Sequence, residues 1–587
     1  MSVADPNDLV RRAQEYLAAG NHDAALELFK SAVAADPTCL VALRSIGMLL
    51  SLKGLFSEAM EYCAQALNLQ PDDLEVVVFM ASCSLKLLRL ADAASYYRRA
   101  ISLNPNIALF HENLALTLQN QGMTAGAEEE FRQAIELDPT QALLSYLGLA
   151  QILQNRNDLQ TAAILCRKVY EIVPDLPMGK YALGQAFLHE GNIVQAEYNL
   201  REAIALQPNL QVALRLLGST LQQSGRFEEA EEFFRKAIEL DPNRGSSYVA
   251  LAMGRKITEQ DRPFVEQMES VLRSGQSMGS DQCAIHFAIG KAFNDLGEYE
   301  SAIKEYDEAN ILAAQIFLGG RPFDPRAHIA LSERVEAIYS RELFEKYRPW
   351  GSESDLPLFI VGMMRSGTTL TEHIVSCHPD VAAGGELAYW SEYELGVVDP
   401  LLLSLDEQKL KRVQTKYLDL LATKAAGKKH VTNKTPGNYS SLGLIHLAFP
   451  RAKLIHCKRD PVDTALSIYM TPDSSPVDFG YVRENIVFGY RMYQRLMDFY
   501  KRVLPPDSII EVQYEDMVAD REGTTRRIVD FLGLEWSDEC LRPEANQRPV
   551  NTPTMWQVRQ PIYTAAVKRW KNYEPWLGAF RELMVEP

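Results

Sequence analysis

The chain has 587 residues, 47% of them hydrophobic, and a net charge of −17, a size that corresponds to about four average domains. No apolar run approaches the roughly 20 residues that a membrane-spanning helix needs, and the N-terminus lacks the basic and apolar regions of a signal peptide. The acidic balance argues against nucleic acid as a partner, and the eight scattered cysteines, without a Cys-x-x-Cys pair, predict reduced thiols and a cytoplasmic location.

The first half of the chain is a repeat array. Prolines recur at a spacing of 34 residues, with one spacing of 35, at Pro37, Pro71, Pro105, Pro139, Pro174, Pro208 and Pro242. An alanine lies twelve residues before each proline, at Ala25, Ala59, Ala93, Ala127, Ala162, Ala196 and Ala230. A period of 34 with small residues where two helices cross is the signature of the tetratricopeptide repeat (TPR). The sequence therefore predicts a TPR α-solenoid over residues 1–316.

The array is irregular at its C-terminal end. Residues 243–282 are degenerate, and a last repeat-like hairpin is expected from Cys283 to about Ile316, with Gly297 at its turn. Residues 317–355 are predicted to form a linker with one helix over about 327–346. Residues 351–587 hold 28 basic and 31 acidic residues, so most of the negative charge lies in the repeats. A solvated helical surface and a groove for a basic peptide both explain this charge.

The second half begins with a motif for binding an anion. Leu358 to Val361 is predicted to be a buried strand, and the loop that follows opens a helix at about Thr368. Backbone N–H groups and hydroxyls over 365–369, with the positive end of the helix, can converge on one phosphate. Gly362 and Gly367 have the spacing of a P-loop NTPase, but Thr368 stands where the P-loop lysine is required. The loop therefore predicts a nucleotide phosphate site that is not built for ATP and magnesium.

A second basic turn follows about 90 residues later. Lys453 to Cys457 is predicted to be a strand, and it runs into Lys458-Arg459-Asp460-Pro461. Ser467 lies eight residues beyond Arg459, on the helix that follows. Taken alone, Arg-Asp-Pro is most often a helix-capping turn. Its position after the first loop favours a second anion contact instead.

The pair of motifs resembles the sulfotransferase family, whose donor is 3′-phosphoadenosine 5′-phosphosulfate (PAPS). The resemblance covers about residues 355–580. It implies that the first loop, with Arg365, Ser366, Gly367, Thr368 and Thr369, holds the 5′-phosphosulfate. It also implies that Arg459 and Ser467 hold the 3′-phosphate, and that Tyr514 lines the adenosine pocket. Thr554 and Arg569 fall at the serine and lysine positions of the segment that closes over the cofactor.

Within the family, the chain most resembles the tyrosylprotein sulfotransferases and bacterial proteins that join such a domain to TPRs. Glu386 lies where that branch has its catalytic glutamate, and Lys434 lies where it has a lysine near the bridging oxygen. Thr471 departs from the pattern, because the tyrosylprotein enzymes have a second 3′-phosphate arginine there. The apparent lack of a membrane anchor is a further departure from the Golgi enzymes.

The residue types fit sulfuryl transfer without the resemblance. The reaction resembles phosphoryl transfer, in which the protein positions groups and neutralises charge. Arg365 and Lys434 would stabilise charge on the leaving phosphate, and Glu386 would take the proton of the acceptor hydroxyl. A helix-capping acid is the structural alternative for Glu386, and His373 and His378 are expected to be structural. No spacing of metal ligands is evident, so no metal is predicted.

We therefore predict a TPR α-solenoid followed by a P-loop-like α/β domain with a parallel sheet over 356–587, acting as a PAPS-dependent sulfotransferase. Protein or peptide tyrosine is the first acceptor, and a small alcohol, a glycan or a lipid headgroup is the alternative. A nucleotide kinase without its lysine and a TPR scaffold with an inactive domain are the rival functions. The array is expected to bind a protein or peptide, and a homodimer is the alternative use of its surface.

Overall fold

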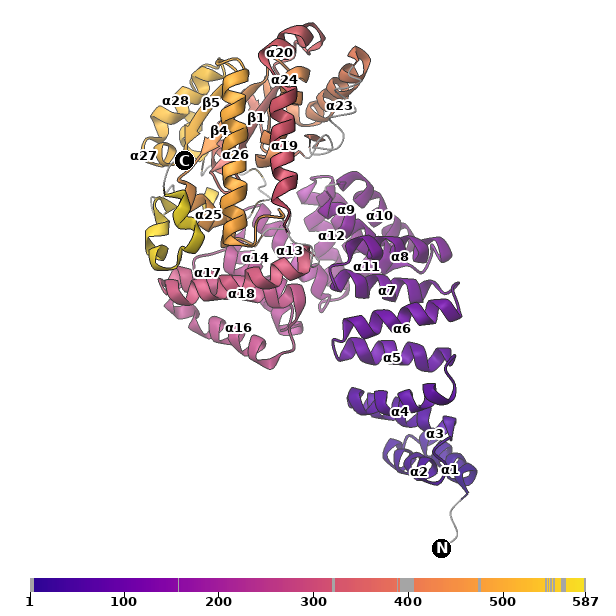
Figure 1. Cartoon of the computed structure of the whole chain (residues 1–587). Helices are drawn as coiled ribbons and strands as arrows, with labels where there is room; N and C mark the ends of the chain where they lie inside the picture. Colours follow the sequence, from indigo (N-terminus) through magenta and orange to yellow (C-terminus); the bar gives the residue numbers. More distant parts are fainter. Residues whose placement is uncertain are drawn as a thin grey trace. The chain divides into compact units, whose positions relative to one another are not determined.

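The structure is a computed structural model that describes residues 5–156, 158–318, 323–387, 389–390, 406–472, 477–543, 546, 548, 552, 555–560 and 566–584. The chain divides into two compact units, residues 1–206 and residues 207–587. The N-terminal unit is helical, and the C-terminal unit contains both helices and a sheet (Figure 1).

The N-terminal unit consists of antiparallel helical hairpins. Helices α1 to α12 span Pro6–Ala18, His22–Ala35, Leu40–Leu52, Phe56–Leu69, Leu74–Lys86, Leu90–Leu103, Ala108–Asn120, Thr124–Leu137, Leu143–Asn155, Leu159–Ile172, Pro177–His189 and Ile193–Leu206. The repeat alanines Ala25, Ala59 and Ala93 are completely buried, as the crossing of two helices requires. Val169, which lies five residues before Pro174 where the other repeats have an alanine, is also completely buried. The predicted α-solenoid is confirmed.

The repeat pattern continues into the C-terminal unit. Helices α13 to α20 span Gln211–Gln223, Phe227–Leu240, Gly245–Met253, Arg262–Ser274, Gly279–Leu296, Tyr299–Leu318, Pro325–Ile338 and Arg341–Tyr347. The hairpin of α17 and α18 is the last predicted repeat, and Gly297 ends α17 in the left-handed conformation. The helix predicted over 327–346 is two helices, so this prediction was wrong. Ser340 interrupts it, because its hydroxyl caps α20 by accepting from the N–H of Leu343 at 3.2 Å.

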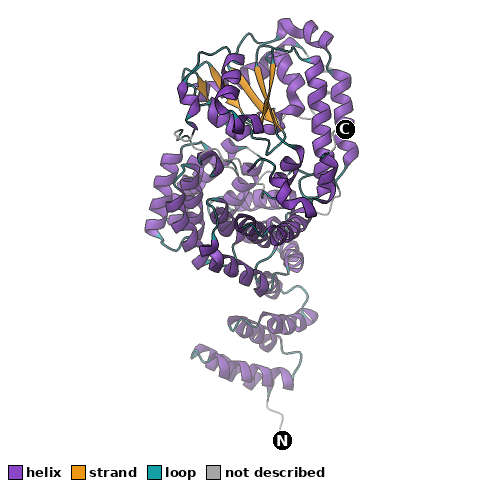
Figure 2. Ribbon diagram, turned by 90° about the vertical axis from the view of Figure 1, so that its left-hand side faces the viewer, coloured by secondary structure: helices purple, strands orange, loops and turns teal. Residues whose placement is uncertain are grey.

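The described strands form one parallel sheet in the order β2-β3-β1-β4-β5. Strands β1 to β5 span Pro357–Gly362, Val381–Ala382, His430–Asn433, Lys453–Lys458 and Ile509–Gln513. Helices α21 and α23 to α28 span Thr368–Val375, Glu407–Ala425, Leu442–Ala448, Pro461–Tyr469, Arg483–Val503, Tyr514–Ala519 and Arg521–Phe531. Helices flank the sheet (Figure 2). Every residue of β1 is buried, as expected for a central parallel strand. The predicted strands and their parallel arrangement are confirmed.

The last repeat hairpin shares a hydrophobic core with the α/β part. Phe287 of α17 and Tyr306 of α18 belong to the same buried cluster as Phe359 of β1 and Tyr469 of α25. Asn310 of α18 donates to the Tyr469 carbonyl at 2.8 Å. Asp307 accepts from the Tyr469 hydroxyl at 2.7 Å. The hairpin is therefore an integral part of the C-terminal unit, and the domain boundary at 316 stays a prediction.

Candidate functional site

The loop between β1 and α21 forms the floor of the site. Gly362 leaves β1 with φ of 155°, and a Cβ atom there would lie 2.4 Å from the Cys457 carbonyl oxygen of β4. Gly367 is the N-cap of α21 with φ of 101°. A Cβ atom at Gly367 would lie 2.8 Å from the ring of Tyr514. Arg365 also has a positive φ, 70°, a conformation that a non-glycine residue adopts only at a cost. The loop is thus wound tightly against the ends of β4 and β5.

Most of the predicted cofactor residues line one cavity of about 150 Å³. The predicted members are Arg365, Gly367, Thr368, Thr369, Arg459, Ser467, Tyr514 and Arg569. They come from the loop after β1, the turn after β4, α25, α27 and the C-terminal segment. Gln557 and Val558, which belong to the segment expected to close over the cofactor, line the same cavity together with Ala566.

The two basic turns are joined directly. The Arg365 Nε donates to the Ser467 hydroxyl at 3.2 Å, and the Arg459 Nη1 donates to the Arg365 carbonyl at 3.2 Å. The Arg459 guanidinium lies 4.9 Å from the centre of the Tyr514 ring. Two guanidinium groups therefore converge at the C-terminal edge of adjacent parallel strands, which is where ligands bind in open α/β sheets.

Two buried polar atoms, one in each basic turn, fit an anionic ligand, although Ser366 is not among the residues that line this cavity. The Ser366 hydroxyl oxygen and the Arg459 Nε are buried without a hydrogen-bond partner among the described residues. A buried polar atom without a partner is costly. A phosphate oxygen supplies the acceptor that each of them can use. The residues present therefore fit a nucleotide phosphate.

Glu386 and Lys434 meet beside the loop. The Lys434 ammonium donates to a carboxylate oxygen of Glu386. The Lys434 side chain is 2% exposed, whereas that of Glu386 is 52% exposed. The backbone N–H of Lys434 also donates to the Gly385 carbonyl at 2.8 Å. An accessible carboxylate held by a buried ammonium can accept a proton from a ligand that reaches it from solvent.

Glu372 supports this arrangement, and the sequence analysis missed it. Its buried carboxylate accepts from the Gly385 N–H at 3.0 Å, the Thr432 hydroxyl at 2.6 Å and Arg548 at 2.9 Å. Burial favours the neutral acid, but Arg548, Lys434 and the hydrogen bonds outweigh it, so the pKa of Glu372 lies below its usual range. The charged Glu372 thus fixes the backbone next to Glu386. An acid on a helix that otherwise carries buried residues was the only available sequence signal.

A second cavity of about 390 Å³ adjoins the loop. Arg365, Thr368, Thr369 and Glu386 line it, so it borders the candidate base and the predicted phosphate loop. Its other wall is the last repeat hairpin, which contributes Ser280, Cys283, Ala284, Phe287, Asn310, Ala313 and Phe317. The Phe317 ring stacks on that of Tyr481, with centroids 5.9 Å apart. The surface of this cavity is thus more apolar than polar, and the Glu386 carboxylate is among its polar groups.

The other predicted residues have different surroundings. Thr554 lies outside the described residues. Thr471 donates from its hydroxyl to the Ser467 carbonyl at 2.7 Å. His378 accepts from the Asp380 N–H at 3.1 Å through Nδ1, and its Nε2 lies 2.7 Å from the Glu535 carbonyl. Burial, together with Arg548, lowers the pKa of His373 to about 4. Both histidines are buried, and a structural role for them stays a prediction.

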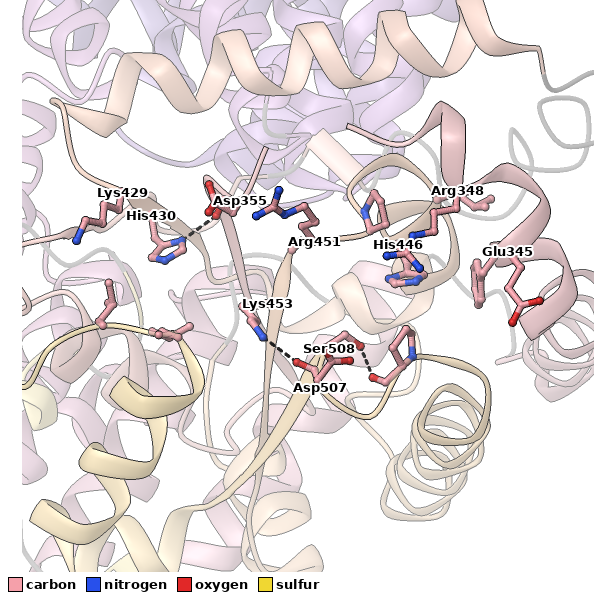
Figure 3. A pocket seen from close by; sticks show the side chains of 18 residues that line it. Glu345, Arg348, Asp355, Lys429, His430, His446, Arg451, Lys453, Asp507 and Ser508 are labelled. Carbon is pink, nitrogen blue, oxygen red and sulfur yellow. Dashed lines mark hydrogen bonds between the residues drawn. The ribbon is translucent and has the colours of Figure 1, made fainter. Parts of the chain in front are cut away.

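A third cavity of about 660 Å³ lies at the opposite edge of the sheet, where the strands begin. Figure 3 shows its lining, which includes His430, His446, Lys453 and Asp507. The Lys453 ammonium donates to the Asp507 carbonyl at 2.8 Å. This cavity is separate from the loop after β1, because parallel strands bring their carboxyl ends to the other edge.

In the described part of the chain, no group of three or more His, Cys, Asp or Glu residues is arranged to hold a metal ion. None of the helices described combines the length and the apolar character needed to cross a membrane.

Comparisons with known proteins identify the class of each half. Residues 357–538 match the model of the sulfotransferase family. Residues 16–83, 85–142, 113–177 and 212–244 match models of the tetratricopeptide repeat. The chain therefore carries a sulfotransferase-family domain after tetratricopeptide repeats, and the predicted resemblance is confirmed.

Similar proteins cover only part of the chain. It is 28% identical over 338 residues to an uncharacterized protein from Aquifex aeolicus, in a match that covers 55% of this chain and 44% of that protein. It is 27% identical over 271 residues to protein-tyrosine sulfotransferase 1 of Danio rerio, covering 40% of this chain and 72% of that enzyme. It is 28% identical over 127 residues to an omega-hydroxy-beta-dihydromenaquinone-9 sulfotransferase of Mycobacterium tuberculosis, covering 20% and 32% respectively.

Proposed function

We propose that the chain transfers a sulfuryl group from PAPS to a hydroxyl, and that protein or peptide tyrosine is the preferred acceptor. The observation that carries the proposal is the pair of adjoining cavities, because Arg365 borders both. Most of the predicted phosphate contacts line the smaller cavity, and Glu386 lines the larger one together with apolar side chains. Bound PAPS would supply the sulfuryl group. The S–O bond to its 5′-phosphate breaks as a new S–O bond to the acceptor oxygen forms.

The residues have distinct roles in this proposal. Ser366, Thr368, Thr369 and the start of α21 hold the 5′-phosphosulfate, and Arg365 and Lys434 neutralise the leaving phosphate. Arg459 and Ser467 hold the 3′-phosphate, with Tyr514 and Arg569 beside the nucleotide. Glu386 takes the hydroxyl proton as the acceptor oxygen attacks. No step requires a metal ion.

The acceptor is supported by the cavity and by similar proteins. A largely apolar pocket with one carboxylate at its end suits a phenol, and several similar proteins are named as protein-tyrosine sulfotransferases. The match to an enzyme named for a dihydromenaquinone supports a lipid-like or small alcohol as the second candidate. We also propose that the N-terminal repeats bind a protein or peptide, and that the chain works in a reducing, cytoplasm-like compartment, because its eight cysteines are free thiols.

Labelled PAPS tests the reaction and its acceptor. Full-length protein and residues 207–587 are incubated with tyrosine peptides, their Tyr→Phe counterparts, small alcohols and glycans. The cut falls at 206 because α17 and α18 belong to the core of the C-terminal unit. Label on tyrosine, absent from the Phe peptides, supports the proposal. Label on small alcohols or glycans alone would overturn the tyrosine acceptor. Preference for ATP with magnesium over 3′-phosphoadenosine 5′-phosphate would support a kinase instead.

Glu386→Gln tests the base. The substitution keeps the shape but cannot accept the proton, so turnover should fall by about 10²- to 10⁴-fold. The affinity for 3′-phosphoadenosine 5′-phosphate, measured by calorimetry, should stay close to that of the unchanged protein. Retained turnover would show that another group takes the proton. If the unchanged protein binds the nucleotide but transfers nothing to any acceptor, the inactive scaffold becomes the better account.

Arg459→Ala tests the 3′-phosphate contact. Loss of a charge-assisted hydrogen bond costs about 1.5–3 kcal/mol, so 3′-phosphoadenosine 5′-phosphate should bind at least about tenfold more weakly. Adenosine 5′-phosphate, which lacks the 3′-phosphate, should be little affected. Arg526→Ala, at an exposed arginine of α28, is the matched control. If Arg459→Ala weakened the binding of both nucleotides equally, Arg459 would not be the contact of the 3′-phosphate.

A further inference from the structure

The C-terminal segment forms one wall of the smaller cavity. Gln557, Val558, Ala566 and Arg569 line it opposite the loop after β1. The segment includes two short 3-10 helices, η7 (Gln557–Arg559) and η9 (Arg569–Trp576). Its described residues lie mostly in short 3-10 helices, which are weak by themselves, so their position depends on contacts with neighbouring elements.

One end of the segment is fixed to a repeat turn. The Arg559 Nη2 donates to the carbonyl of Gln223, the last residue of α13, at 2.6 Å. The Arg559 side chain also lies against Gly225, where a Cβ atom would come within 2.8 Å of its Nε. Gly225 has φ of 81°, the conformation of a helix-ending glycine. The turn between α13 and α14 thus provides a socket for Arg559.

The other end is fixed to the last repeat hairpin. The side-chain oxygen of Asn294, near the end of α17, accepts from Arg569 Nη2 at 2.8 Å and from the Tyr573 hydroxyl at 2.8 Å. The Tyr573 ring packs edge-on against Tyr299 of α18, with centroids 5.1 Å apart. Asn572 donates to the Tyr299 hydroxyl at 3.1 Å. One asparagine therefore orients both the cavity-lining arginine and a buried tyrosine.

The α/β part holds the same segment from the opposite side. Arg459 Nη2 donates to the Ala566 carbonyl at 2.6 Å, and the Trp570 N–H donates to Asp463 at 2.8 Å. Arg459 and Asp463, on the α/β side of the cavity, are thus hydrogen-bonded to the segment. Arg569 reaches the cavity only while η9 keeps its place between α18 and α25.

We propose that the repeats of the C-terminal unit are part of the nucleotide site, and that Asn294 is a positioning residue for Arg569. Arg559, in the socket at Gln223 and Gly225, is the second anchor. The inference rests on the proposed function, because it assigns the cavity to the adenosine nucleotide. It gives the terminal repeats a role in donor binding that is independent of any partner of the array.

Asn294→Leu in the full-length chain tests the proposal. It removes the acceptor of two hydrogen bonds, one of them from a charged donor, so affinity for 3′-phosphoadenosine 5′-phosphate should fall about tenfold. The KM for PAPS should rise by a similar factor, with a smaller change in kcat. Asn294→Asp keeps an acceptor oxygen and should restore affinity. Lys304→Ala, at an exposed residue of the same hairpin, is the control.

Hydrogen exchange of the ligand-free protein tests the anchor without any nucleotide. Asn294→Leu should raise exchange over 566–576 and leave β1 and β4 protected. Tyr573→Phe and Arg559→Ala are second variants should Asn294→Leu fold poorly, and each should raise exchange near its own anchor. Unchanged exchange over 566–576 would overturn the anchor. Raised exchange with unchanged nucleotide affinity would show that the segment is not part of the nucleotide site. If the unchanged protein fails to bind the nucleotide, the proposed function is contradicted. The exchange result would then still decide whether Asn294 anchors the segment.

Discussion

Two hairpins with the same repeat pattern pack against different kinds of neighbour in this chain. In α6, Ala93, Tyr97 and Ala100 are buried, and the clusters that contain Tyr97 and Ala100 are made of repeat residues. In α18, Ala302, Tyr306 and Ala309 have the same spacing and equal burial, but their cluster includes strands and helices of the α/β part. The repeat pattern therefore specifies how one hairpin is built and leaves open what its outer face packs against.

The largest expected difference comes from removing the matched tyrosines. Tyr306→Ala and Tyr97→Ala each delete a buried ring, at a cost of about 3–5 kcal/mol in the free energy of unfolding. We expect Tyr306→Ala to destabilise residues 207–587 and to reduce nucleotide binding. Tyr97→Ala should destabilise residues 1–206 and leave nucleotide binding unchanged. Hydrogen exchange of each unit, with calorimetric titration of the nucleotide, measures both. Equal loss of binding in the two variants would contradict the comparison.

Acid should weaken the C-terminal unit through His446. Burial, together with Arg348, lowers the pKa of His446 to about 4, below the 6.5 of an unfolded histidine. The unfolded chain then binds a proton that the folded chain does not, so stability falls as pH drops from about 6.5 to 4. The slope is at most about 1.4 kcal/mol per pH unit. The surroundings of His446 are visible in Figure 3.

His446→Gln tests this effect. Denaturant unfolding of residues 207–587 between pH 6.5 and 4.5 should show a shallower pH dependence in the variant than in the unchanged protein. Lys304→Ala, at an exposed residue of α18 within the same fragment, should leave that dependence as it is. An identical slope with and without His446 would exclude it as a source of acid sensitivity.

The smallest expected difference in stability concerns the outer faces of the two hairpins. Asp307 of α18 accepts from the Tyr469 hydroxyl and from Arg483 Nη2 at 2.5 Å. Asp307→Ala should therefore cost about 1–2 kcal/mol of the stability of residues 207–587. The equivalent residue of α6 is Arg98, which is exposed, so Arg98→Ala should change stability by no more than about 0.5 kcal/mol. Chemical denaturation of the two variants gives both values, and equal losses would show that this face of α18 is not used.

The sequence predicted the local features that depend on short-range patterns. The 34-residue period predicted the hairpins, because a small residue at each crossing is required by packing between adjacent helices. The strand of apolar residues before Gly362 predicted the loop, because a buried parallel strand and a tight turn leave a clear local pattern. The order of the two basic motifs along the chain predicted two anion contacts in one domain. The structure joins Arg365 and Arg459 directly, because the carboxyl ends of parallel strands lie at one edge.

Only the tertiary structure revealed the residues that act over long sequence separations. Glu372 and Arg548 are 176 residues apart, and Asn294 and Arg569 are 275 residues apart. Neither pair has a local signature, because a buried carboxylate or a hydrogen-bonding asparagine has the same sequence context whatever accepts or donates on the other side. The sequence by itself determined the repeats, the sheet and the basic loops. The folded chain decided that the last repeat hairpin would form a wall of the site, because packing energy depends on which apolar faces meet in space.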